Sequence, residues 1–363
     1  MQINKISFKN YRNLYDNEIE FCDGINVIYG LNANGKTNLA EAIWLLTGIK
    51  SFRGNKDKEL INKNNFTENT KIKGYFLSNG RKQTAEIEID KKRSAVLNEV
   101  KLNSPNELSK SFSAIVFSPT DMYLISDGPS MRRKFLDNAI SMLRPKYAKI
   151  MSDYKNAVLQ RNSVLKDVTF HSELSVMLDL FEQTIAKTGS YIINQRIKYI
   201  DALMNELPKI YSGISNNKEE LELIYKSSIK GDFTEENIFN QLKESRREDI
   251  KNLATSVGPH RDDFEFIING DDLKIFGSQG QKRSAILSVK LSEAEILKRH
   301  FGEMPIIILD DVMSELDKTR QDYILNHIKG SQVFITCCDA QTINILENGK
   351  CFYVENGEIS EKK

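Results

Sequence analysis

A glycine-rich loop near the N-terminus is the feature that most restricts the possible folds of this chain. It matches the pattern G-x-x-x-x-G-K-[ST] at every defined position, through Gly30, Leu31, Asn32, Ala33, Asn34, Gly35, Lys36 and Thr37. A short apolar segment precedes the loop, and apolar residues recur three and four apart after it, as far as Gly48. The sequence therefore predicts a strand, a loop and a helix in that order, which begin an α/β fold.

Such a loop supports the binding of a nucleoside triphosphate. Backbone N–H groups of the loop and the N-terminus of the following helix converge on phosphate oxygens. We expect Lys36 to reach the β- and γ-phosphates of ATP, and the Thr37 hydroxyl to bind Mg²⁺. The alternative is an ordinary glycine-containing turn with a solvated lysine.

Two acidic residues near the other end of the chain fit the same chemistry. The apolar segment 304–310 ends in Asp310, and Asp311 follows at once. Runs of this kind are typical of parallel strands covered on both faces, and ligands gather at the carboxyl ends of such strands. We expect Asp310 to hold Mg²⁺ through water and Asp311 to orient or deprotonate the attacking water. Taken alone, the two acids are also compatible with a cap on the next turn.

The wide separation of these motifs predicts a large insertion between them. The middle of the chain has a helical period, whereas both ends mix strand and helix patterns. We expect a discontinuous α/β head formed by residues 1–125 and 250–363, with an antiparallel layer, and a mainly helical second lobe formed by residues 126–249. Residues 216–220 and 358–363 are expected to be mobile.

Composition excludes several classes of protein. Lys and Arg total 51 against 50 Asp and Glu, so the formal net charge of +1 provides no overall attraction for nucleic acid or anionic lipid. No run of about 18 apolar residues is present, which excludes a membrane-spanning helix. The N-terminal residues lack the apolar core of a signal peptide. The Cys and His residues lack metal-ligand spacing, so we expect a reduced cytosolic protein whose Cys are small, buried and apolar.

A third motif, Gly277–Gln281, immediately precedes a predicted helix. By itself, Ser278 is compatible with a simple N-cap. The order along the chain is more informative, because the phosphate loop, the Ser-x-Gly-Gln segment and the acidic strand end are followed by the Ser-Glu-Leu-Asp segment 314–317. This order resembles the ABC ATPase head, whose successive motifs are Walker A, signature, Walker B and D-loop.

A closer resemblance covers nearly the whole chain. It is carried by seven segments: FKNYRNL, GLNANGKTNLAEAI, KSFRG, FSPTDMYLISDGPSMRRKFLD, SVGPHRDDF, SQGQKRSA and ILDDVMSELD. In this order they are similar to segments of the RecF family of bacterial DNA replication and repair proteins, which are SMC-like ABC ATPases. The resemblance implies an ABC-type ATPase head with a mixed sheet and an antiparallel layer. It also implies a mainly helical second lobe, SMC-like but without a long coiled coil.

The resemblance also implies a function and partners. We expect an ATP-dependent DNA-binding protein of recombinational repair, bound to double-stranded and single-stranded DNA at gap junctions as an ATP-dependent homodimer. It is expected to act with RecR and RecO in loading RecA, and to be needed for replication-fork maintenance and SOS induction. The implied activity is a weak DNA-dependent ATPase that uses ATP and Mg²⁺, whose slow hydrolysis releases the dimer. The implied location is cytoplasmic, without a membrane partner.

Family motifs imply roles for further residues. In ABC heads the signature helix contacts the γ-phosphate held by a second subunit, so Ser278 and Gln281 are expected to act on a partner's ATP. Arg12 resembles an arginine that touches nucleotide phosphates in SMC-like heads. Arg53 resembles the SMC arginine on the loop after the Walker A helix. A surface charge is the alternative for each arginine, and His260 is either a turn histidine or a γ-phosphate contact.

Five basic clusters are candidate DNA contacts: Arg81–Lys82, Lys91–Arg93, Arg132–Lys134, Arg246–Arg247 and Lys282–Arg283. Each alone is more often a solvated face, although the last follows the signature motif, where ATP and DNA binding could be coupled. No aromatic stacking platform is evident, since Trp44 is expected to lie in the core. These features favour phosphate-backbone binding without base readout.

Other functions fit parts of this pattern. One is an ATP-gated DNA clamp for which hydrolysis is only a release timer. A transporter's nucleotide-binding subunit is disfavoured by the degenerate signature and the spacing of the two Walker motifs. An SMC-type cohesion protein is disfavoured because the insertion lacks sustained heptads.

Departures from the ABC pattern predict slow turnover. Asp311 stands where ABC ATPases have the longer Glu, and Gln279 stands where transporters have Gly. No Q-loop glutamine is evident, because its SMC position aligns roughly with Ser118. Poor positioning of water should hold the steady-state ATPase rate well below about 10 s⁻¹, and a measured rate of that order or above would contradict this expectation.

Overall fold

The structure, a computed structural model, describes residues 1–65, 68–167, 174–215, 219–338 and 349–362. The chain divides into two compact units. Unit 1 comprises Met1–Met122, Lys209–Asn217 and Arg283–Lys363, and unit 2 comprises Tyr123–Pro208 and Lys218–Lys282. These boundaries differ from the expected ones, because the stretch from 250 to 282 belongs to unit 2 and a short stretch from 209 belongs to unit 1.

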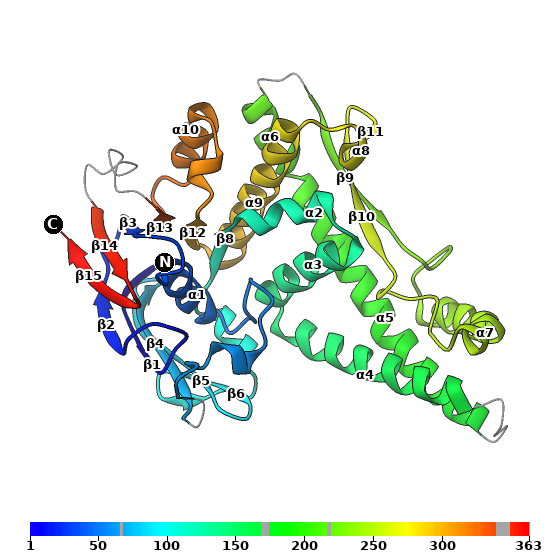
Figure 1. Cartoon of the computed structure of the whole chain (residues 1–363). Coiled ribbons are helices and arrows are strands. Elements are labelled where there is room, and N and C mark those ends of the chain that lie inside the picture. The colour runs from blue at the N-terminus through cyan, green and yellow to red at the C-terminus, as the bar shows by residue number, and fades with distance from the viewer. Residues whose placement is uncertain (66–67, 168–173, 216–218, 339–348, 363) are drawn as a thin grey trace. The chain divides into compact units, whose positions relative to one another are not determined.

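Unit 1 contains an antiparallel sheet built from the N-terminal third of the chain (Figure 1). Its strands, in spatial order, are β2 (Asn17–Glu20), β1 (Gln2–Lys9), β4 (Thr70–Ser78), β5 (Arg81–Ile89), β6 (Arg93–Leu97) and β7 (Val100–Lys101). Buried and half-buried residues alternate along β4, as expected for a sheet with one face in the core. The predicted antiparallel layer is confirmed.

A second six-stranded sheet of unit 1 is mostly parallel and carries the predicted motifs at its strand ends. In spatial order its strands are β15 (Glu358–Lys362), β14 (Gly349–Glu355), β3 (Ile25–Tyr29), β13 (Val333–Cys337), β12 (Ile306–Asp310) and β8 (Ala114–Phe117). Only β15 pairs antiparallel. All five residues of β12 and all five of β13 are buried, which agrees with their continuous apolar runs.

Helix α1 (Lys36–Leu45) fills the core of unit 1. It contacts β4 of the antiparallel sheet and β8, β12 and β13 of the mostly parallel sheet. A helix covered on two sides must be apolar on more than one face, and eight of its ten residues are buried. Trp44 is buried, as predicted, and its indole N–H donates to the Lys50 carbonyl at 2.9 Å.

The other helical elements of unit 1 are shorter or cross its boundary. They are α10 (Lys318–His327), most of α9 (Gln279–Phe301), part of α6 (Leu207–Ser215) and the 3-10 turns Asp57–Leu60, Pro105–Lys110, Pro119–Met122 and Met313–Glu315. The Tyr323 hydroxyl of α10 donates to the Ile210 carbonyl of α6 at 3.2 Å. This hydrogen bond links the α6 end to the rest of unit 1.

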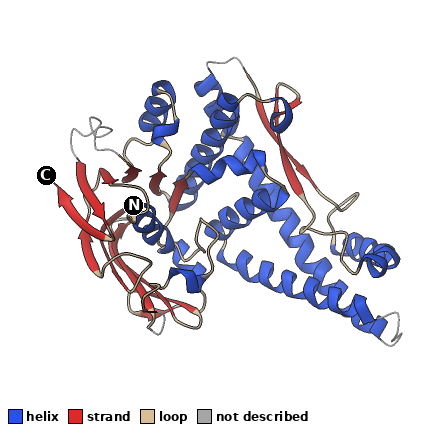
Figure 2. Cartoon of the chain, in the orientation of Figure 1, coloured by secondary structure: helices blue, strands red, loops and turns tan. Residues whose placement is uncertain are grey.

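Unit 2 is mainly helical, as predicted, and contains a small three-stranded sheet (Figure 2). Its helices are α2 (Tyr123–Ser126), α3 (Pro129–Leu143), α4 (Pro145–Asp167), α5 (Ser175–Met204), α7 (Glu235–Asn252) and α8 (Leu273–Phe276). Its strands are β9 (Leu221–Lys226), β10 (Asp263–Ile268) and β11 (Asp271–Asp272). Six residues of β10 pair with β9, which explains why the unit extends beyond residue 249.

Three smaller expectations can be compared with the structure. Residues 358–362 form strand β15 and are not mobile, so that prediction was wrong. The expectation for 216–218 falls outside the described residues. Cys337 is buried, but Cys338 is exposed, so the Cys residues are only partly the buried apolar groups expected. Among the residues that the structure describes, no helix is both long and apolar enough to cross a membrane.

A buried charge network joins the helices of unit 2. The fully buried Arg161 of α4 donates to Glu182 of α5 at 2.9 Å and to Asp249 of α7 at 2.7 Å. It also donates to the Thr255 hydroxyl at 3.0 Å. Both carboxylates are fully buried, and Arg161 compensates the charge of each, together with Arg246 at Glu182.

Removal of this guanidinium should destabilise unit 2 strongly. We expect Arg161→Met to lower the free energy of unfolding by about 3–5 kcal/mol, because the buried Asp249 loses its cationic partner and the buried Glu182 keeps only Arg246. Urea unfolding followed by circular dichroism measures the effect. The matched control is Arg247→Met, at an exposed position of α7, which should change stability by no more than about 0.5 kcal/mol. Equal effects of the two substitutions would contradict the expectation.

Candidate nucleotide-binding site

The glycine-rich loop connects β3 to α1, and its backbone explains its two defining glycines. Gly30 has φ 148° and Gly35 has φ 120°, values that side chains rarely adopt. A Cβ atom at Gly30 would lie 2.2 Å from the Val354 carbonyl oxygen, and one at Gly35 would lie 2.6 Å from Leu14. Any other residue at these positions would displace the loop.

The C-terminal hairpin holds this loop from the side. The Asn34 amide donates to the Val354 carbonyl of β14 at 3.3 Å, and the Gly357 backbone N–H donates to the Asn34 carbonyl at 3.0 Å. Asn356, between β14 and β15, lines the same pocket as the loop. The hairpin therefore forms part of the site, a role that nothing in its polar sequence indicated.

Lys36 is folded against its own loop. Its side chain is almost fully buried, and Nζ donates to the carbonyls of Gly30 at 2.8 Å and Leu31 at 3.2 Å, and to Asn32 Oδ1 at 3.3 Å. The exposed Cys338 lies beside it, with Sγ 3.0 Å from Asn32 Oδ1. The ammonium group is thus placed at the mouth of the loop, where the phosphate pattern requires a cation.

Thr37 and Asp310 meet although they lie at opposite ends of the sequence. The Thr37 hydroxyl donates to Asp310 Oδ1 at 3.0 Å. Thr336, from the intervening strand β13, donates to the same oxygen at 2.8 Å. Burial raises the pKa of the Asp310 carboxyl, while the two hydroxyl hydrogen bonds and the charge of Arg53 act in the opposite direction. A hydroxyl and a carboxylate are hard oxygen donors, so this pair fits Mg²⁺.

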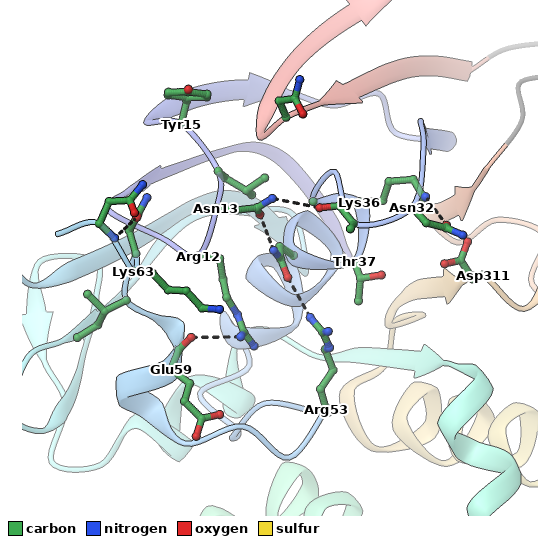
Figure 3. A pocket seen from close by; sticks show the side chains of 18 residues that line it. Arg12, Asn13, Tyr15, Asn32, Lys36, Thr37, Arg53, Glu59, Lys63 and Asp311 are labelled. Carbon is green, nitrogen blue, oxygen red and sulfur yellow. Dashed lines mark hydrogen bonds between the residues drawn. The ribbon is translucent and has the colours of Figure 1, made fainter. Parts of the chain in front are cut away.

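Asp311 occupies a distinctive backbone position directly after β12. Its φ of 54° lies in the left-handed region, which is uncommon for a residue other than glycine. Its backbone N–H donates to the Thr336 hydroxyl at 2.9 Å, and its carbonyl accepts from Ser314 at 3.1 Å. The side chain lines the same pocket as Lys36 and Thr37 (Figure 3).

The pocket has a volume of about 670 Å³. Figure 3 shows side chains entering it from the loop, from the turn after β1 and from the segment around Lys63. Its walls are formed by residues 12–15, 32–33, 35–38, 53, 59, 61–64, 311 and 356. The volume and the convergence of Lys36, Thr37 and Asp311 fit a nucleotide with its phosphates at the loop.

Both predicted arginines line this pocket, and each is held by a residue of α1. Arg12 Nη2 lies 2.7 Å from Glu41 Oε2, and Arg53 Nη1 donates to Asn38 Oδ1 at 2.9 Å. Arg12 has a φ of 52°, a left-handed backbone conformation that is uncommon for a residue other than glycine. Arg12 is partly buried in an ion pair, whereas Arg53 is exposed, so the roles of both arginines toward a nucleotide stay predictions.

The signature segment belongs to unit 2 and forms a reciprocal cap at the start of α9. The Ser278 backbone N–H donates to Gln281 Oε1 at 2.7 Å, and the Gln281 backbone N–H donates to Ser278 Oγ at 3.2 Å. This is a capping box. The Gln281 amide also donates to Glu219 at 2.7 Å. Within one chain these two residues therefore act as helix caps, and their expected role toward a partner's ATP stays a prediction.

His260 is engaged inside unit 2. Its Nδ1 lies 2.5 Å from the Tyr154 hydroxyl, and its Nε2 lies 3.0 Å from the Thr255 carbonyl. Burial lowers its pKa. The geometry favours the turn histidine over the phosphate contact.

Most of the basic clusters contain arginines held in ion pairs. Arg93 pairs with Asp57 at 2.5 Å, Arg132 with Asp263 at 2.7 Å, and Arg246 with Glu182. In the fifth cluster, Arg283 donates to the Glu315 carbonyl. Arg81 and Lys82, at the β4–β5 turn, are both exposed. The structure therefore narrows the set of candidate DNA contacts without choosing among them.

Sequence reasoning missed three residues that organise the site. They are Asn38 and Glu41, which hold the two arginines, and Thr336, which bridges Asp310 and Asp311. Glu41 had a visible signal, since it is a charged residue between alanines in the apolar part of a predicted helix. Thr336 had none, because a threonine in an apolar strand is common.

Comparison with known proteins agrees with this geometry. The family described as RecF/RecN/SMC N terminal domain matches residues 2–360. A DNA replication and repair protein RecF from Caldanaerobacter subterraneus subsp. tengcongensis is 39% identical over 373 aligned positions, covering 99% of each chain. A RecF protein of the same description from Clostridium acetobutylicum is also 39% identical and covers 99% of this chain and 100% of its own.

Solved structures show the same relationship. The recombination mediator protein RecF with ATPrS, in the RecFOR pathway, matches with a TM-score of 0.92 at 38% identity, covering 99% of this chain and 98% of its own. A Smc head domain from Pyrococcus furiosus matches with a TM-score of 0.53 at 16% identity, covering 100% of this chain and 96% of its own, a likeness of fold alone. The predicted ABC-type, SMC-like head is confirmed, and the chain belongs to the RecF family of DNA replication and repair proteins.

Proposed function

We propose that this chain is an ATP-dependent DNA-binding protein of recombinational repair. Its ATP-bound dimer acts on DNA near single-strand gaps, with RecR and RecO, to promote RecA loading. In this role it serves replication-fork maintenance and SOS induction in the cytoplasm. The observation that carries the proposal is the convergence of Lys36, Thr37 and Asp311 on one pocket, with Asp310 hydrogen-bonded to Thr37, in a chain of the RecF family.

The residues of unit 1 are suited to hold a triphosphate. Loop N–H groups between Gly30 and Thr37 would bind phosphate oxygens. Lys36 would give up its hydrogen bonds to the loop carbonyls and donate instead to the β- and γ-phosphates. Thr37 and Asp310 would hold Mg²⁺, which neutralises phosphate charge. Arg12 and Arg53 line the same pocket and would add charge-assisted hydrogen bonds.

Asp311 is our candidate for the residue that orients or deprotonates the attacking water. Its carboxyl lines the pocket. Its backbone is hydrogen-bonded to Thr336 and Ser314, and these bonds fix the position of its Cα atom. The side chain is one methylene shorter than Glu, which would place water poorly. A weak, DNA-dependent ATPase follows, with hydrolysis serving to release the dimer.

The proposed dimer completes the site in trans. The capped N-terminus of α9, with Ser278 and Gln281, would face the γ-phosphate bound by the second copy. One ATP would then join two copies, since each provides the half-site that the other lacks. Double-stranded and single-stranded DNA at gap junctions would be bound through phosphate contacts.

Action in trans predicts complementation between two inactive variants. Lys36→Met loses the phosphate loop cation and Ser278→Arg blocks the signature helix, so each alone should stay monomeric with ATP and duplex DNA. A mixture of the two restores one intact composite site and should sediment partly as a dimer. The control is the double variant, which restores no site with either single variant. A mixture that remains monomeric while the wild type dimerises would contradict shared sites, and a monomeric wild type would contradict ATP-dependent dimerisation.

The substitution Asp311→Asn tests the alternative of an ATP-gated DNA clamp, in which hydrolysis only sets the time of release. The amide cannot accept a proton, so ATP hydrolysis should fall by about 100-fold or more. If the clamp view holds, ATP-dependent dimerisation and DNA binding persist, and the DNA complex dissociates more slowly than that of the wild type. Steady-state ATPase assays and DNA dissociation kinetics measure both. Loss of dimerisation together with hydrolysis would contradict the clamp view.

A further inference from the structure

A buried carboxylate lies in the middle of the helix that begins at the phosphate loop. Glu41 of α1 is fully buried, although the helix around it is apolar. Transfer of a carboxylate from water to such a site is costly unless it is paired and hydrogen-bonded. Since the family motifs assign no role to Glu41, its partners indicate what its burial achieves.

The main partner of Glu41 is Arg12. Arg12 Nε donates to Glu41 Oε2 at 3.0 Å, and Nη2 donates to Oε2 at 2.7 Å and to Oε1 at 3.0 Å. The same Nη2 also donates to Asn55 Oδ1 at 2.9 Å, and Nη1 donates to the Glu59 carbonyl at 3.1 Å. A fork that bridges both carboxylate oxygens sets the orientation of the guanidinium plane as well as its position.

Glu41 also anchors the segment that carries Arg53. Its carboxylate accepts from the Ser51 hydroxyl, and that hydroxyl oxygen accepts from the Arg53 backbone N–H at 3.2 Å. The Arg53 guanidinium is held by Asn38, three residues before Glu41 and therefore on the same side of α1. Tyr11 contributes a further hydrogen bond to Glu41 at 3.0 Å, and burial and the nearby carboxylate raise the pKa of its hydroxyl.

We propose that Glu41 is a positioning residue that fixes Arg12 for contact with the phosphates of a bound nucleotide. The inference rests on the proposed function, because it assumes that ATP occupies the pocket. An arginine loses much rotamer freedom when it is ordered, so a guanidinium already held by Glu41 can bind phosphate without that entropy loss. Helix α1 then presents Lys36 directly and Arg12 through Glu41, so one rigid element sets both cations.

The test compares ATP affinity among four variants by calorimetric titration with ATP and Mg²⁺ in the cold, after circular dichroism has established which of them are folded. Glu41→Gln keeps the shape but turns an amide toward Arg12, and should weaken ATP binding by about tenfold or more. The matched control is Glu182→Gln, which changes a fully buried, arginine-paired glutamate of unit 2 that lines no part of the pocket. The control should lower thermal stability but leave ATP affinity at the wild-type value.

A double variant separates positioning from a structural role. If Glu41 acts through Arg12, then Glu41→Gln should cause no further loss of affinity in an Arg12→Met background. It should also recover part of the thermal stability lost in Arg12→Met, because that variant leaves the Glu41 charge buried without its main partner. The inference would be overturned if the affinity losses of Glu41→Gln and Arg12→Met add in full in the double variant. It would also be overturned if Glu41→Gln binds ATP as tightly as the wild type.

Two further outcomes remain decisive. If Glu41→Gln does not fold, Glu41→Asp replaces it, because it keeps the charge but draws the guanidinium back by one methylene. That variant should also bind ATP more weakly, and unchanged affinity would overturn the inference. If the wild type and Glu182→Gln both fail to bind ATP, the proposed function itself fails. If the wild type and Glu41→Gln bind ATP with equal affinity, the inference about Glu41 fails, but the proposed function stands.

Discussion

The parallel pairing of β13 with both β3 and β12 is the constraint on which the whole site depends. It sets the phosphate loop and the acidic strand end two strands apart on one sheet edge. There Thr336 fills the intervening position and bonds to Asp310 and to Asp311. Neither the loop nor the acids alone define a metal site. The three-strand arrangement brings a hydroxyl from one end of the chain within hydrogen-bond distance of a carboxylate from the other, which is the pair proposed to hold Mg²⁺.

In both units a buried carboxylate is paired with an arginine, but the pairs have different roles. In unit 2, Arg161 compensates Glu182 and Asp249 and thereby joins three helices. In unit 1, Glu41 compensates Arg12, which lines the pocket. A buried ion pair is weak evidence for net stability, since an apolar replacement can be as stable. It does impose one geometry on its partners, which is what a helix junction and a phosphate site both need.

Local patterns made much of the fold predictable. The strand before Gly30, the helix after Gly35 and the strand that ends at Asp310 were all found, because each motif carries its own periodicity and end signals. The roles of Lys36, Thr37, Asp310 and Asp311 were predicted from these motifs, and the structure brings the four residues to one place.

What escaped prediction depends on contacts between distant segments. The boundary of unit 2 was misplaced because β10 pairs with β9, and one strand's pattern does not reveal its partner. Residues 358–363 were expected to be mobile, yet 358–362 pair with β14, a long-range partner that the segment's own sequence does not reveal. Glu41 lies in a helix whose apolar period was recognised, but a single charge within such a period does not say which arginine it meets.

The contacts between the phosphate loop and the C-terminal hairpin have a consequence for how the protein is made. Asn34 is fixed by Val354 and Gly357, which the ribosome adds more than three hundred residues after the loop itself. A nascent chain that has emerged only as far as β12 thus carries a loop that lacks these supports. Full assembly of the pocket around this loop therefore waits for the last strands to be synthesised, so an unfinished chain lacks part of its wall.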